Sequence, residues 1–223
     1  MTDTVAIVGG TGPEGRGLAL RFARAGVPVV VGSRDAARAA EIAAGLAPGD
    51  GLALSGAANP DAASQADIVL VAVPWEGHER TIRDLADVLA GKLVVDIVNP
   101  LEFDDRGPVT IRVPEGSAAE QAAALLPRST VVAGFHHVSA KHLVDESHPV
   151  DTDVLVCGDD RAAKDRVIAL AERVPGVRGI DAGLLRMAHI LEDWTSVLLS
   201  VNRGYRTSAG IRLSDLDPAR RRP

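Results

Sequence analysis

Gly10-Thr11-Gly12-Pro13-Glu14-Gly15 follows an apolar run, Thr4 to Val8, and opens a stretch of helical periodicity. Glycines at this spacing between a strand and a helix are typical of the turn that binds a dinucleotide. Gly10 permits the tight turn, Gly12 lets the backbone approach a pyrophosphate, and Gly15 allows the helix to pack closely on the strand. The phosphates would bind free N–H groups at the positive end of the helix dipole. We therefore predict dinucleotide binding; the alternative is that the glycines only shape a loop.

The end of the second expected strand, residues 27–31, indicates which dinucleotide is bound. An acidic residue here would accept the ribose 2'-hydroxyl of NAD, but this chain has Ser33 and Arg34, with Arg38 one helical turn further on. A hydroxyl and two guanidinium groups can hold a 2'-phosphate by charge-assisted hydrogen bonds. Asp35 is adjacent, but we expect it to cap the following helix. The pattern predicts NADP(H); the alternative is that the two arginines are solvated surface residues.

Up to Phe135, short runs rich in valine and isoleucine alternate with longer stretches rich in alanine, leucine and arginine. This alternation is typical of an α/β fold with a Rossmann-type, doubly wound parallel sheet. We expect residues 1–135 to form the NADP-binding domain and residues 136–223 to form a small C-terminal α/β domain that packs on it. The expected strands are 4–8, 27–31, 52–55, 68–73, 92–97, 129–135, 154–157 and 177–181, and the expected helices are 13–25, 35–46, a brief one from Asn59 as its cap, 76–89, one from Ser117 as its cap, 161–173 and 184–205.

The composition of the 223-residue chain fits a globular protein with a sizeable core, since 46% of residues are hydrophobic and 24% are charged. A formal net charge of -6 argues against nucleic-acid binding, and we expect the basic run 220–222 to be a solvated chain end. No apolar run approaches the ~20 residues of a membrane helix, and the first residues lack the features of a signal peptide. Cys157 is the only cysteine, so we expect an inert, buried thiol in a cytoplasmic protein.

Ligands of open α/β sheets bind beyond the carboxyl ends of the strands. Pro74 and Trp75 follow one expected strand and could form a rigid apolar wall for a nicotinamide ring, although Trp75 could instead pack locally at a helix start. Asn99 and Pro100 follow the next strand as a polar turn that could offer an amide to the ring. A third strand ends just before residues 136–140.

Residues 136–153 are polar, show no helical or strand periodicity and hold four of the six histidines. These four could bind a metal, but no helical or hairpin spacing favours it. His136 or His137 could be a general acid in the reduction of a carbonyl or imine. We favour a third interpretation, in which the histidines line the pocket or face solvent and the backbone of residues 138–140 contacts the cofactor. The chain has no Tyr-x-x-x-Lys pair and no Ser-His-Asp constellation, which suggests hydride transfer without a proton relay.

Motifs along nearly the whole chain match one known family, and two of them, Val156-Cys157-Gly158-Asp159-Asp160 and Asp181-Ala182-Gly183, lie outside the generic fingerprint. The others are Gly9-Gly10-Thr11-Gly12, Gly15-x-Gly17-Leu18-Ala19-Leu20-Arg21, Val30-Val31-Gly32-Ser33-Arg34, Val73-Pro74-Trp75-Glu76, Ser117-Ala118-Ala119-Glu120 and Val138-Ser139-Ala140. With these motifs the chain resembles the coenzyme F420H2:NADP oxidoreductases (NADPH-dependent F420 reductases). The resemblance implies direct hydride exchange between C4 of the nicotinamide and C5 of the 5-deazaflavin, with the two rings stacked in a cleft between the domains.

The resemblance also implies that no catalytic side chain is obligatory, because proximity and orientation of the two cofactors suffice; His136 and His137 are the possible exceptions. It implies that the stretch near Ala209-Gly210 lies beside the deazaflavin. The cofactor-binding residues that we predict from the motifs and the resemblance together are Gly10, Thr11, Gly12, Pro13, Glu14, Gly15, Ser33, Arg34, Arg38, Val73, Pro74, Trp75, Gly77, Asn99, Pro100, His136, Ser139, Ala140 and Ala209.

Two positions depart from the family pattern. His136-His137 stands where relatives tend to carry Asn-Thr or His-Thr, and Gly77 replaces a larger residue of some relatives. The alternatives are therefore an NADP-dependent imine or ketone reductase with His136 or His137 as acid, or a non-catalytic NADP(H) sensor. We expect NADP(H) and coenzyme F420 to be the small-molecule partners of a cytoplasmic homodimer that binds no metal, nucleic acid or membrane.

Overall fold

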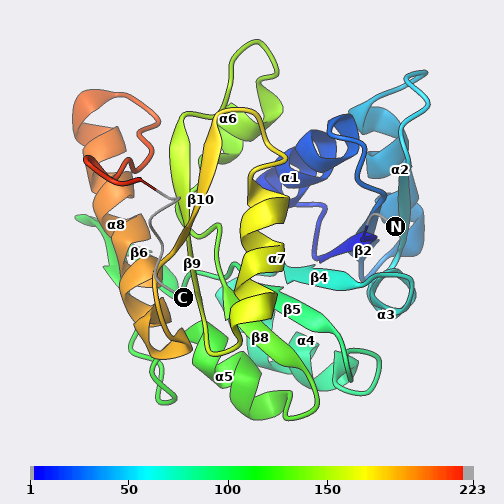
Figure 1. Cartoon of the computed structure of the whole chain (residues 1–223), viewed down its shortest axis with the longest axis horizontal. Coiled ribbons are helices and arrows are strands. Elements are labelled where there is room, and N and C mark those ends of the chain that lie inside the picture. Colours follow the sequence, from blue (N-terminus) through cyan, green and yellow to red (C-terminus); the bar gives the residue numbers. More distant parts are fainter. Residues whose placement is uncertain (1–2, 218–223) are drawn as a thin grey trace.

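An eight-stranded sheet forms the centre of the protein (Figure 1). In this computed structural model, which describes residues 3–217, the strand order is β10-β9-β8-β5-β4-β1-β2-β3. The β8–β9 pair is antiparallel and the other neighbouring pairs are parallel. The six strands from β3 to β8 follow the order of a Rossmann-type sheet. The strands are β1 (Val5–Val8), β2 (Val29–Ser33), β3 (Leu54–Ala58), β4 (Ile68–Val71), β5 (Leu93–Asp96), β8 (Thr130–Ala133), β9 (Thr152–Gly158) and β10 (Val177–Asp181).

Helices cover both faces of the sheet because successive side chains of a strand point to opposite faces. In β1, Val5 and Ile7 pack into one helix layer while Ala6 and Val8 pack into the other. This arrangement confirms the predicted doubly wound α/β fold. One layer holds α1 (Pro13–Arg24), α2 (Ala36–Leu46), α6 (Ala140–Val144) and α7 (Arg161–Ala171), and the other holds α3 (Asn59–Ser64), α4 (His78–Leu85), α5 (Ala118–Leu125) and α8 (Ala188–Tyr205). The short 3-10 turns η1 (Trp75–Gly77) and η2 (Leu185–Met187) precede α4 and α8.

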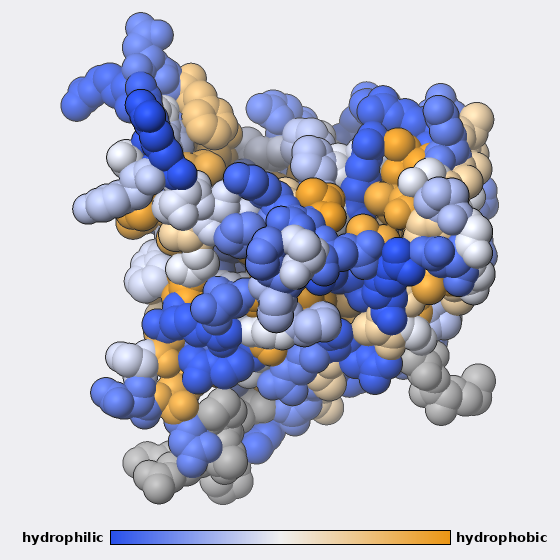
Figure 2. Space-filling view, turned by 90° about the horizontal axis from the view of Figure 1, so that it is seen from above, coloured by the Kyte–Doolittle hydropathy of each residue, from blue (hydrophilic) through white to orange (hydrophobic). Residues whose placement is uncertain are grey.

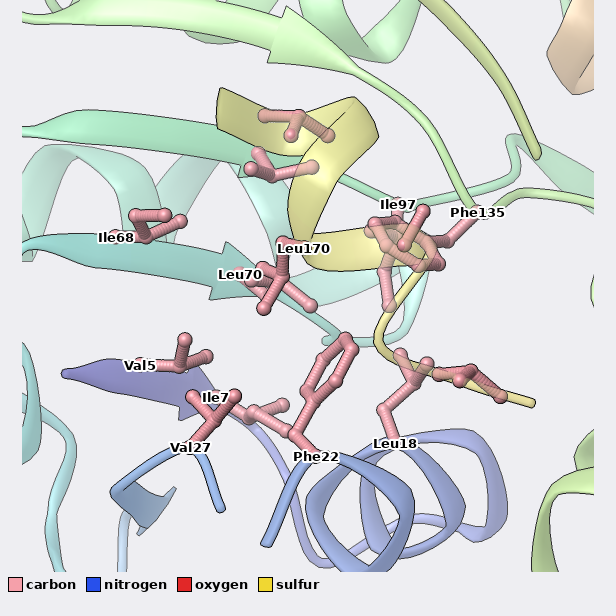
Figure 3. Close-up of a cluster of buried hydrophobic side chains, with 14 of the residues drawn as sticks. Val5, Ile7, Leu18, Phe22, Val27, Ile68, Leu70, Ile97, Phe135 and Leu170 are labelled. Carbon is pink, nitrogen blue, oxygen red and sulfur yellow. The ribbon is translucent and has the colours of Figure 1, made fainter. Parts of the chain in front are cut away.

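The core between the sheet and the α1 layer is mostly aliphatic, with one aromatic pair (Figure 3). Phe22 of α1 and Phe135 meet edge to face, with ring centroids 6.0 Å apart and planes at 84°. Both side chains are fully buried, and burying a side chain of this size contributes roughly 1.5–3 kcal/mol. The pair therefore anchors the chain just after β8 onto the helix that starts at the glycine turn.

The C-terminal stretch extends the same sheet rather than forming a separate one. β9 pairs with β8 only through its last residues, with Ala133 opposite Cys157 and Val132 opposite Gly158. Because the two strands are antiparallel, the first part of β9 stands beyond the carboxyl end of β8. β10 pairs with β9 along its whole length, so the two strands form a wall beside the edge where ligands of such sheets bind.

Three local expectations were wrong. Ala58, not Asn59, is the N-cap of α3, and Asn59 is the first helical residue. The polar stretch 136–153 contains the short helix α6. Arg21 of α1 donates hydrogen bonds to backbone oxygens of this helix, a distant contact that no local pattern reveals. Residues after Asn99 form an unexpected hairpin of β6 (Leu101–Asp104) and β7 (Gly107–Thr110).

Other expectations about local structure are confirmed. Asp35 caps α2, since its carboxylate accepts a hydrogen bond from Arg38 N at 3.1 Å. Ser117 caps α5 by accepting from Glu120 N at 3.0 Å. Cys157 is buried in β9, and burial raises the pKa of its thiol to about 12, which makes it an unreactive core residue.

The face shown in Figure 2 is largely hydrophilic, with smaller apolar patches between the polar groups. Within residues 3–217, no helix is both long enough and apolar enough to cross a membrane. The basic run 220–222 lies outside the described residues.

Candidate active site

The glycine turn connects β1 to α1 at the carboxyl edge of the sheet. Gly10 N donates to Ile7 O and Gly32 O, at 3.0 and 2.9 Å, which ties the turn to both neighbouring strands. A Cβ on Gly15 would lie 2.5 Å from the Cα of Gly10, so the helix can approach the turn this closely only without a side chain. By contrast, no described atom lies within 4 Å of a Cβ built on Gly12. The turn is therefore tightly packed at Gly10 and Gly15 and open at Gly12, as a pyrophosphate-binding turn requires.

Asn59 supports this turn from the start of α3. Its Oδ1 accepts a hydrogen bond from Gly9 N at 3.2 Å, and a Cβ on Gly32 would lie 2.8 Å from the same oxygen. The side chain is buried, so it fixes Gly9, whose φ of 73° lies in the left-handed region. Sequence reasoning missed this role because an Asn-Pro-Asp triplet is also a typical helix start.

Glu14 is the titratable side chain of the turn. Its Oε1 is shut off from solvent and has no hydrogen-bond partner among the described residues. Burial raises the pKa of this carboxyl to about 8, so it is mostly neutral at physiological pH. A neutral carboxyl at this place is compatible with a neighbouring phosphate, whereas an ionised one would repel it.

Ser33 is the last residue of β2, which is next to β1 in the sheet, Arg34 follows it directly, and Arg38 lies in the first turn of α2. The Ser33 hydroxyl is buried and accepts from Asp35 N at 3.2 Å. Arg34 and Arg38 are exposed. With Asp35 engaged in capping α2, its carboxylate is turned to the helix backbone.

Val73, Pro74 and Trp75 follow β4, the other neighbour of β1. Val73 packs on the glycine turn, since its Cγ1 lies 2.6 Å from a Cβ built on Gly9. Trp75 is half-buried at the start of η1 and stacks on His78, with ring centroids 5.5 Å apart and planes at 26°. Local packing of Trp75, the alternative considered above, is thus present in the structure. Gly77 ends η1, and no described atom lies within 4 Å of a Cβ placed there.

Asn99 and Thr195 meet around the backbone oxygen of His136. Asn99 Nδ2 donates to His136 O at 3.0 Å, and Thr195 Oγ1 lies 2.9 Å from the same oxygen and 3.0 Å from Asn99 Oδ1. The Asn99 amide, which we expected to face a bound ring, is therefore engaged with the protein. Thr195 comes from α8, far along the chain, and no local pattern indicates its role.

His136 and His137 are both buried, so the expectation that they could face solvent is wrong. Phe135, just before them, has a φ of 65°, and this left-handed turn directs the pair inward. Neither ring nitrogen of His136 has a partner among residues 3–217, and burial lowers the pKa of His136 to about 4. Burial also lowers the pKa of His137. Both rings are neutral at physiological pH and are therefore poor proton donors.

The other two histidines of this stretch, His142 and His148, are exposed. The described part of the chain has no group of three or more His, Cys, Asp or Glu side chains that could hold a metal ion. Ser139 caps α6 by accepting from His142 N, at 3.5 Å, and Ala140 is the first residue of this helix.

Arg21 attaches α6 to α1. Its buried guanidinium donates to the backbone oxygens of Leu143, His142 and His148, at 2.8, 2.9 and 3.1 Å. A Cβ on Gly17 of α1 would lie 2.4 Å from Leu143 Cβ, so the two helices touch at a glycine. Ser139 and Ala140 are thereby held close to the helix that begins at the glycine turn.

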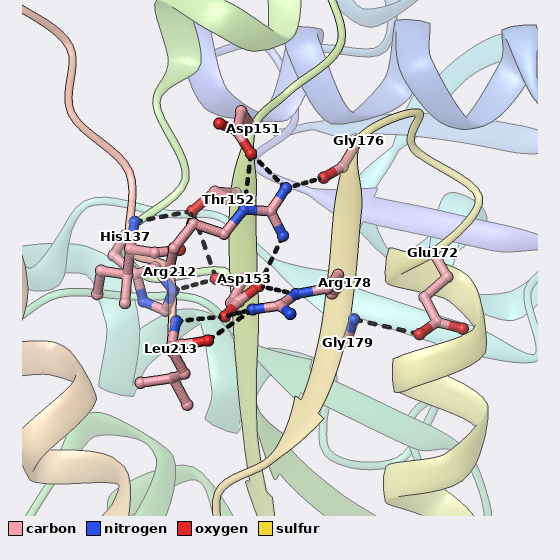
Figure 4. A network of polar contacts seen from close by, with 11 residues as sticks. His137, Asp151, Thr152, Asp153, Glu172, Gly176, Arg178, Gly179, Arg212 and Leu213 are labelled. Atoms are coloured by element: carbon pink, nitrogen blue, oxygen red, sulfur yellow. Dashed lines mark hydrogen bonds and ion pairs between the residues drawn. The ribbon is translucent and has the colours of Figure 1, made fainter. Parts of the chain in front are cut away.

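Asp153 holds the C-terminal segment against β9 (Figure 4). Its carboxylate accepts from Arg178 Nε and Arg212 Nη1, both at 2.7 Å, and from Leu213 N at 2.8 Å. Although burial by itself raises the pKa of Asp153, these donors lower it to about 2. A Cβ on Gly210 would lie 2.8 Å from Thr152 Oγ1, so the segment lies directly on the strand. Ala209 comes directly before Gly210 in this segment, and its N–H donates to Asn202 Oδ1 at 2.7 Å.

The chain is similar to known proteins in both sequence and fold. A family model described as "NADP oxidoreductase coenzyme F420-dependent" matches residues 4–100. The F420-dependent NADP reductase of Methanothermobacter thermautotrophicus is 41% identical over 224 residues, which is 97% of each chain. The enzyme of the same name from Methanothermobacter marburgensis is 39% identical over 220 residues, covering 95% of this chain and 98% of the relative.

A solved structure from Arthrobacter sp. FB24, provisionally named an F420-dependent NADP reductase, is 28% identical with a TM-score of 0.76. The match covers 92% of this chain and 96% of that one. Identity near 40% along almost the whole length of two curated relatives is far more than a shared Rossmann fold would give. The chain belongs to the family of the F420-dependent NADP reductases.

Proposed function

We propose that this chain catalyses hydride transfer between NADP(H) and coenzyme F420, so that F420H2 and NADP+ give F420, NADPH and a proton. The two cofactors supply the reactive atoms, C4 of the nicotinamide and C5 of the deazaflavin, and the protein supplies binding and orientation. The observation that carries the proposal is the identity with curated reductases of this name over nearly the full chain.

The NADP side of the site belongs to residues 1–135. We assign the pyrophosphate to the turn Gly10–Gly15, with Gly12 as the point of closest approach. We assign the 2'-phosphate to Ser33 at the end of β2, to Arg34 directly after it and to Arg38 in the first turn of α2; both arginines are exposed. Val73, Pro74, Trp75, Gly77, Asn99 and Pro100 would line the nicotinamide, together with Ser139 and Ala140.

The deazaflavin side belongs to residues 136–223 in this proposal. His136 stands on the loop beyond β8, and Ala209 stands on the segment that Asp153 holds against β9. The pKa of His136, which burial lowers to about 4, supports a role as a neutral pocket residue. The hydride itself moves directly between the two cofactors, so this step does not require a protonated histidine, whereas reduction of an imine or ketone would need a donor.

The decisive assay mixes the purified protein with NADPH and coenzyme F420 and follows the loss of deazaflavin absorbance. Turnover is expected, and the His136→Ala and His137→Ala variants should lose only a small part of the rate. No turnover with F420, together with reduction of an imine or ketone and large losses in the histidine variants, would establish the reductase alternative. Binding of NADPH without transfer to any of these acceptors would instead indicate an NADP(H) sensor.

We further propose that the protein forms a homodimer in the cytoplasm. An exposed apolar row runs along η2 and α8, with side chains three or four residues apart and 37–57% exposed: Met187, Ile190, Trp194 and Val197. Such a row is typical of a helix that packs against a partner. Val197→Glu should shift the mass measured by light scattering from two copies to one, whereas Arg80→Glu, at an 89% exposed position of α4, should not. A cytoplasmic location fits the unpaired Cys157.

A further inference from the structure

His78 is the first residue of α4 and is fully buried, with a hydrogen-bond acceptor at each ring nitrogen. Nε2 lies 2.7 Å from Asp96 Oδ2, and Nδ1 lies 2.9 Å from Gln121 Oε1. The amide of Gln121 is oriented by its own Nε2, which donates to Glu115 Oε2 at 3.3 Å. A neutral imidazole can donate from one nitrogen only. Two acceptors therefore require a doubly protonated His78, which forms an ion pair with Asp96.

Asp96 is the last residue of β5 and is as deeply buried as His78. Its second oxygen, Oδ1, accepts from Val98 N at 3.0 Å. This bond shapes the turn that leads directly to Asn99, whose amide donates to His136 O. The Asp96 carboxylate thus accepts a hydrogen bond from the loop after β5, while its partner His78 contacts the loop after β4.

Trp75 covers the other side of His78. The indole and imidazole planes are 26° apart with centroids at 5.5 Å, a geometry in which a cationic ring is attracted to the indole face. The ion pair therefore contacts both loops that are proposed to line the nicotinamide, one through the Trp75 ring and the other through the Val98 amide.

The surroundings keep the pair charged. Burial alone would lower the pKa of His78, but the hydrogen bond and charge of Asp96 outweigh it, and the pKa is raised. Glu192 of α8 is also buried nearby and accepts from Ala118 N and Ala119 N, at 3.0 and 3.3 Å. Burial raises the pKa of Glu192 to about 8. The ionisable groups facing the pair from other elements are Glu115, Glu192 and His136.

We propose that the His78–Asp96 ion pair is a positioning device of the nicotinamide site, which sets the plane of Trp75 and the path of the Asn99 turn together. This inference rests on the proposed function for its place in the reaction. In this proposal the two buried residues touch neither cofactor. Their effect falls on the alignment of the nicotinamide for hydride transfer, and cofactor binding depends on other residues.

The first test measures Trp75 without any deazaflavin. A cationic imidazole stacked on an indole quenches its fluorescence, so Trp75 should be dim in a Trp194→Phe background, in which it is the sole tryptophan. In that background, His78→Gln should increase the fluorescence of Trp75 at neutral pH and alter the change in that fluorescence when NADPH is added. His189→Gln replaces a half-buried histidine on α8 and should leave both signals unchanged. Equal Trp75 fluorescence in the His78→Gln variant and its parent would show that His78 is not a cation stacked on Trp75.

The second test separates positioning from stability. Replacing a buried ion pair by apolar side chains of similar size is often neutral for stability or even favourable. The double variant His78→Leu with Asp96→Leu should therefore stay folded, while kcat for F420 reduction falls roughly 10- to 100-fold, the loss expected from a misplacement near 1 Å. KM for NADPH should change little. A folded double variant with the parent's kcat, or one in which KM alone rises, would refute the positioning role.

The two tests also distinguish this inference from the proposed function. If the parent protein shows no F420 turnover, the proposed function fails, while the Trp75 signals in NADPH titrations still report on the pair. If the parent is active and the double variant is equally active, the proposed function stands and the positioning role fails.

Discussion

Nε2 of His137 lies 2.7 Å from the backbone oxygen of Asp153, so the loop after β8 is joined to the first part of β9. The carboxylate of the same aspartate binds Arg178, Arg212 and the amide of Leu213. One residue thus connects the histidine loop with the C-terminal segment, on the side of the site that we assign to the deazaflavin.

Asp153→Asn should therefore weaken both stability and the acceptor side of the site. The pKa of Asp153 in the folded protein is about 2, below its ordinary value of 3.8. The corresponding stability, about 2 kcal/mol, is present above pH 3.8 and is lost as the pH falls through 2. Urea denaturation should show an acid-dependent loss over this range that is smaller in the variant. Asp151→Asn is the control, because Asp151 also pairs with Arg212 but is 83% exposed; an equal acid dependence in the parent and the Asp153 variant would contradict this prediction.

Gly12 and Gly15 should respond in opposite ways to the same added methyl group. A Cβ at Gly15 meets the backbone of Gly10 at 2.5 Å, so Gly15→Ala should lower the stability by about 1–3 kcal/mol. A Cβ at Gly12 meets no described atom within 4 Å, and its φ of -75° is accessible to alanine. Gly12→Ala should keep its melting temperature and lose NADPH affinity, because the methyl group occupies the space of the pyrophosphate. If the folded Gly12→Ala protein binds NADPH with the parent's affinity, the pyrophosphate does not bind at this turn.

Much of the fold could be predicted because its signals are local. A strand that is buried on both faces must be apolar throughout, as Val5–Val8 and Ile68–Val71 are. The cap at Asp35 depends on residues within four positions of it. The hairpin after Asn99 was missed because its strands are short and contain no buried residue, so they lack the apolar alternation by which strands are recognised.

The site was predictable only where one segment carries it. The glycine turn and the Ser33-Arg34 corner each lie within a few residues and were found. The residues that brace them act across the fold: Asn59 reaches Gly9 over 50 positions, Thr195 reaches Asn99 over 96, and Arg21 reaches Leu143 over 122. Such contacts depend on tertiary packing, and the burial of His136 depends on it equally.

Arg34→Ala should weaken NADPH far more than NADH. The exposed guanidinium beside Ser33 is expected to bind the 2'-phosphate, which NADH lacks. Losing a charge-assisted hydrogen bond of about 1.5–3 kcal/mol corresponds to a roughly 10- to 100-fold rise in Kd for NADPH. Titration of both coenzymes measures the ratio, and added salt should reduce the difference.

Arg80→Ala is the matched control for this change, since Arg80 is an exposed arginine on α4 whose side chain is 89% exposed. It should leave both dissociation constants unchanged. Equal weakening of NADPH and NADH by Arg34→Ala would show that the arginine acts on a part of the molecule common to both coenzymes.

Glu14→Gln should remove a pH dependence from both folding and coenzyme binding. The folded-state pKa of Glu14 is raised by burial from 4.5 to about 8, so its contribution to stability is complete below pH 4.5 and is lost as the pH rises through 8. The parent should therefore lose stability relative to the glutamine variant across this range. Above it, the ionised carboxylate in the glycine turn repels the phosphates, so the parent should bind NADPH more weakly at about pH 9 than at neutral pH. The variant should hold its affinity over the same interval, as measured by NADPH titration, while Glu76→Gln, at an exposed position, should behave as the parent does. A parallel loss of affinity in the parent and Glu14→Gln would show that another group in the site titrates.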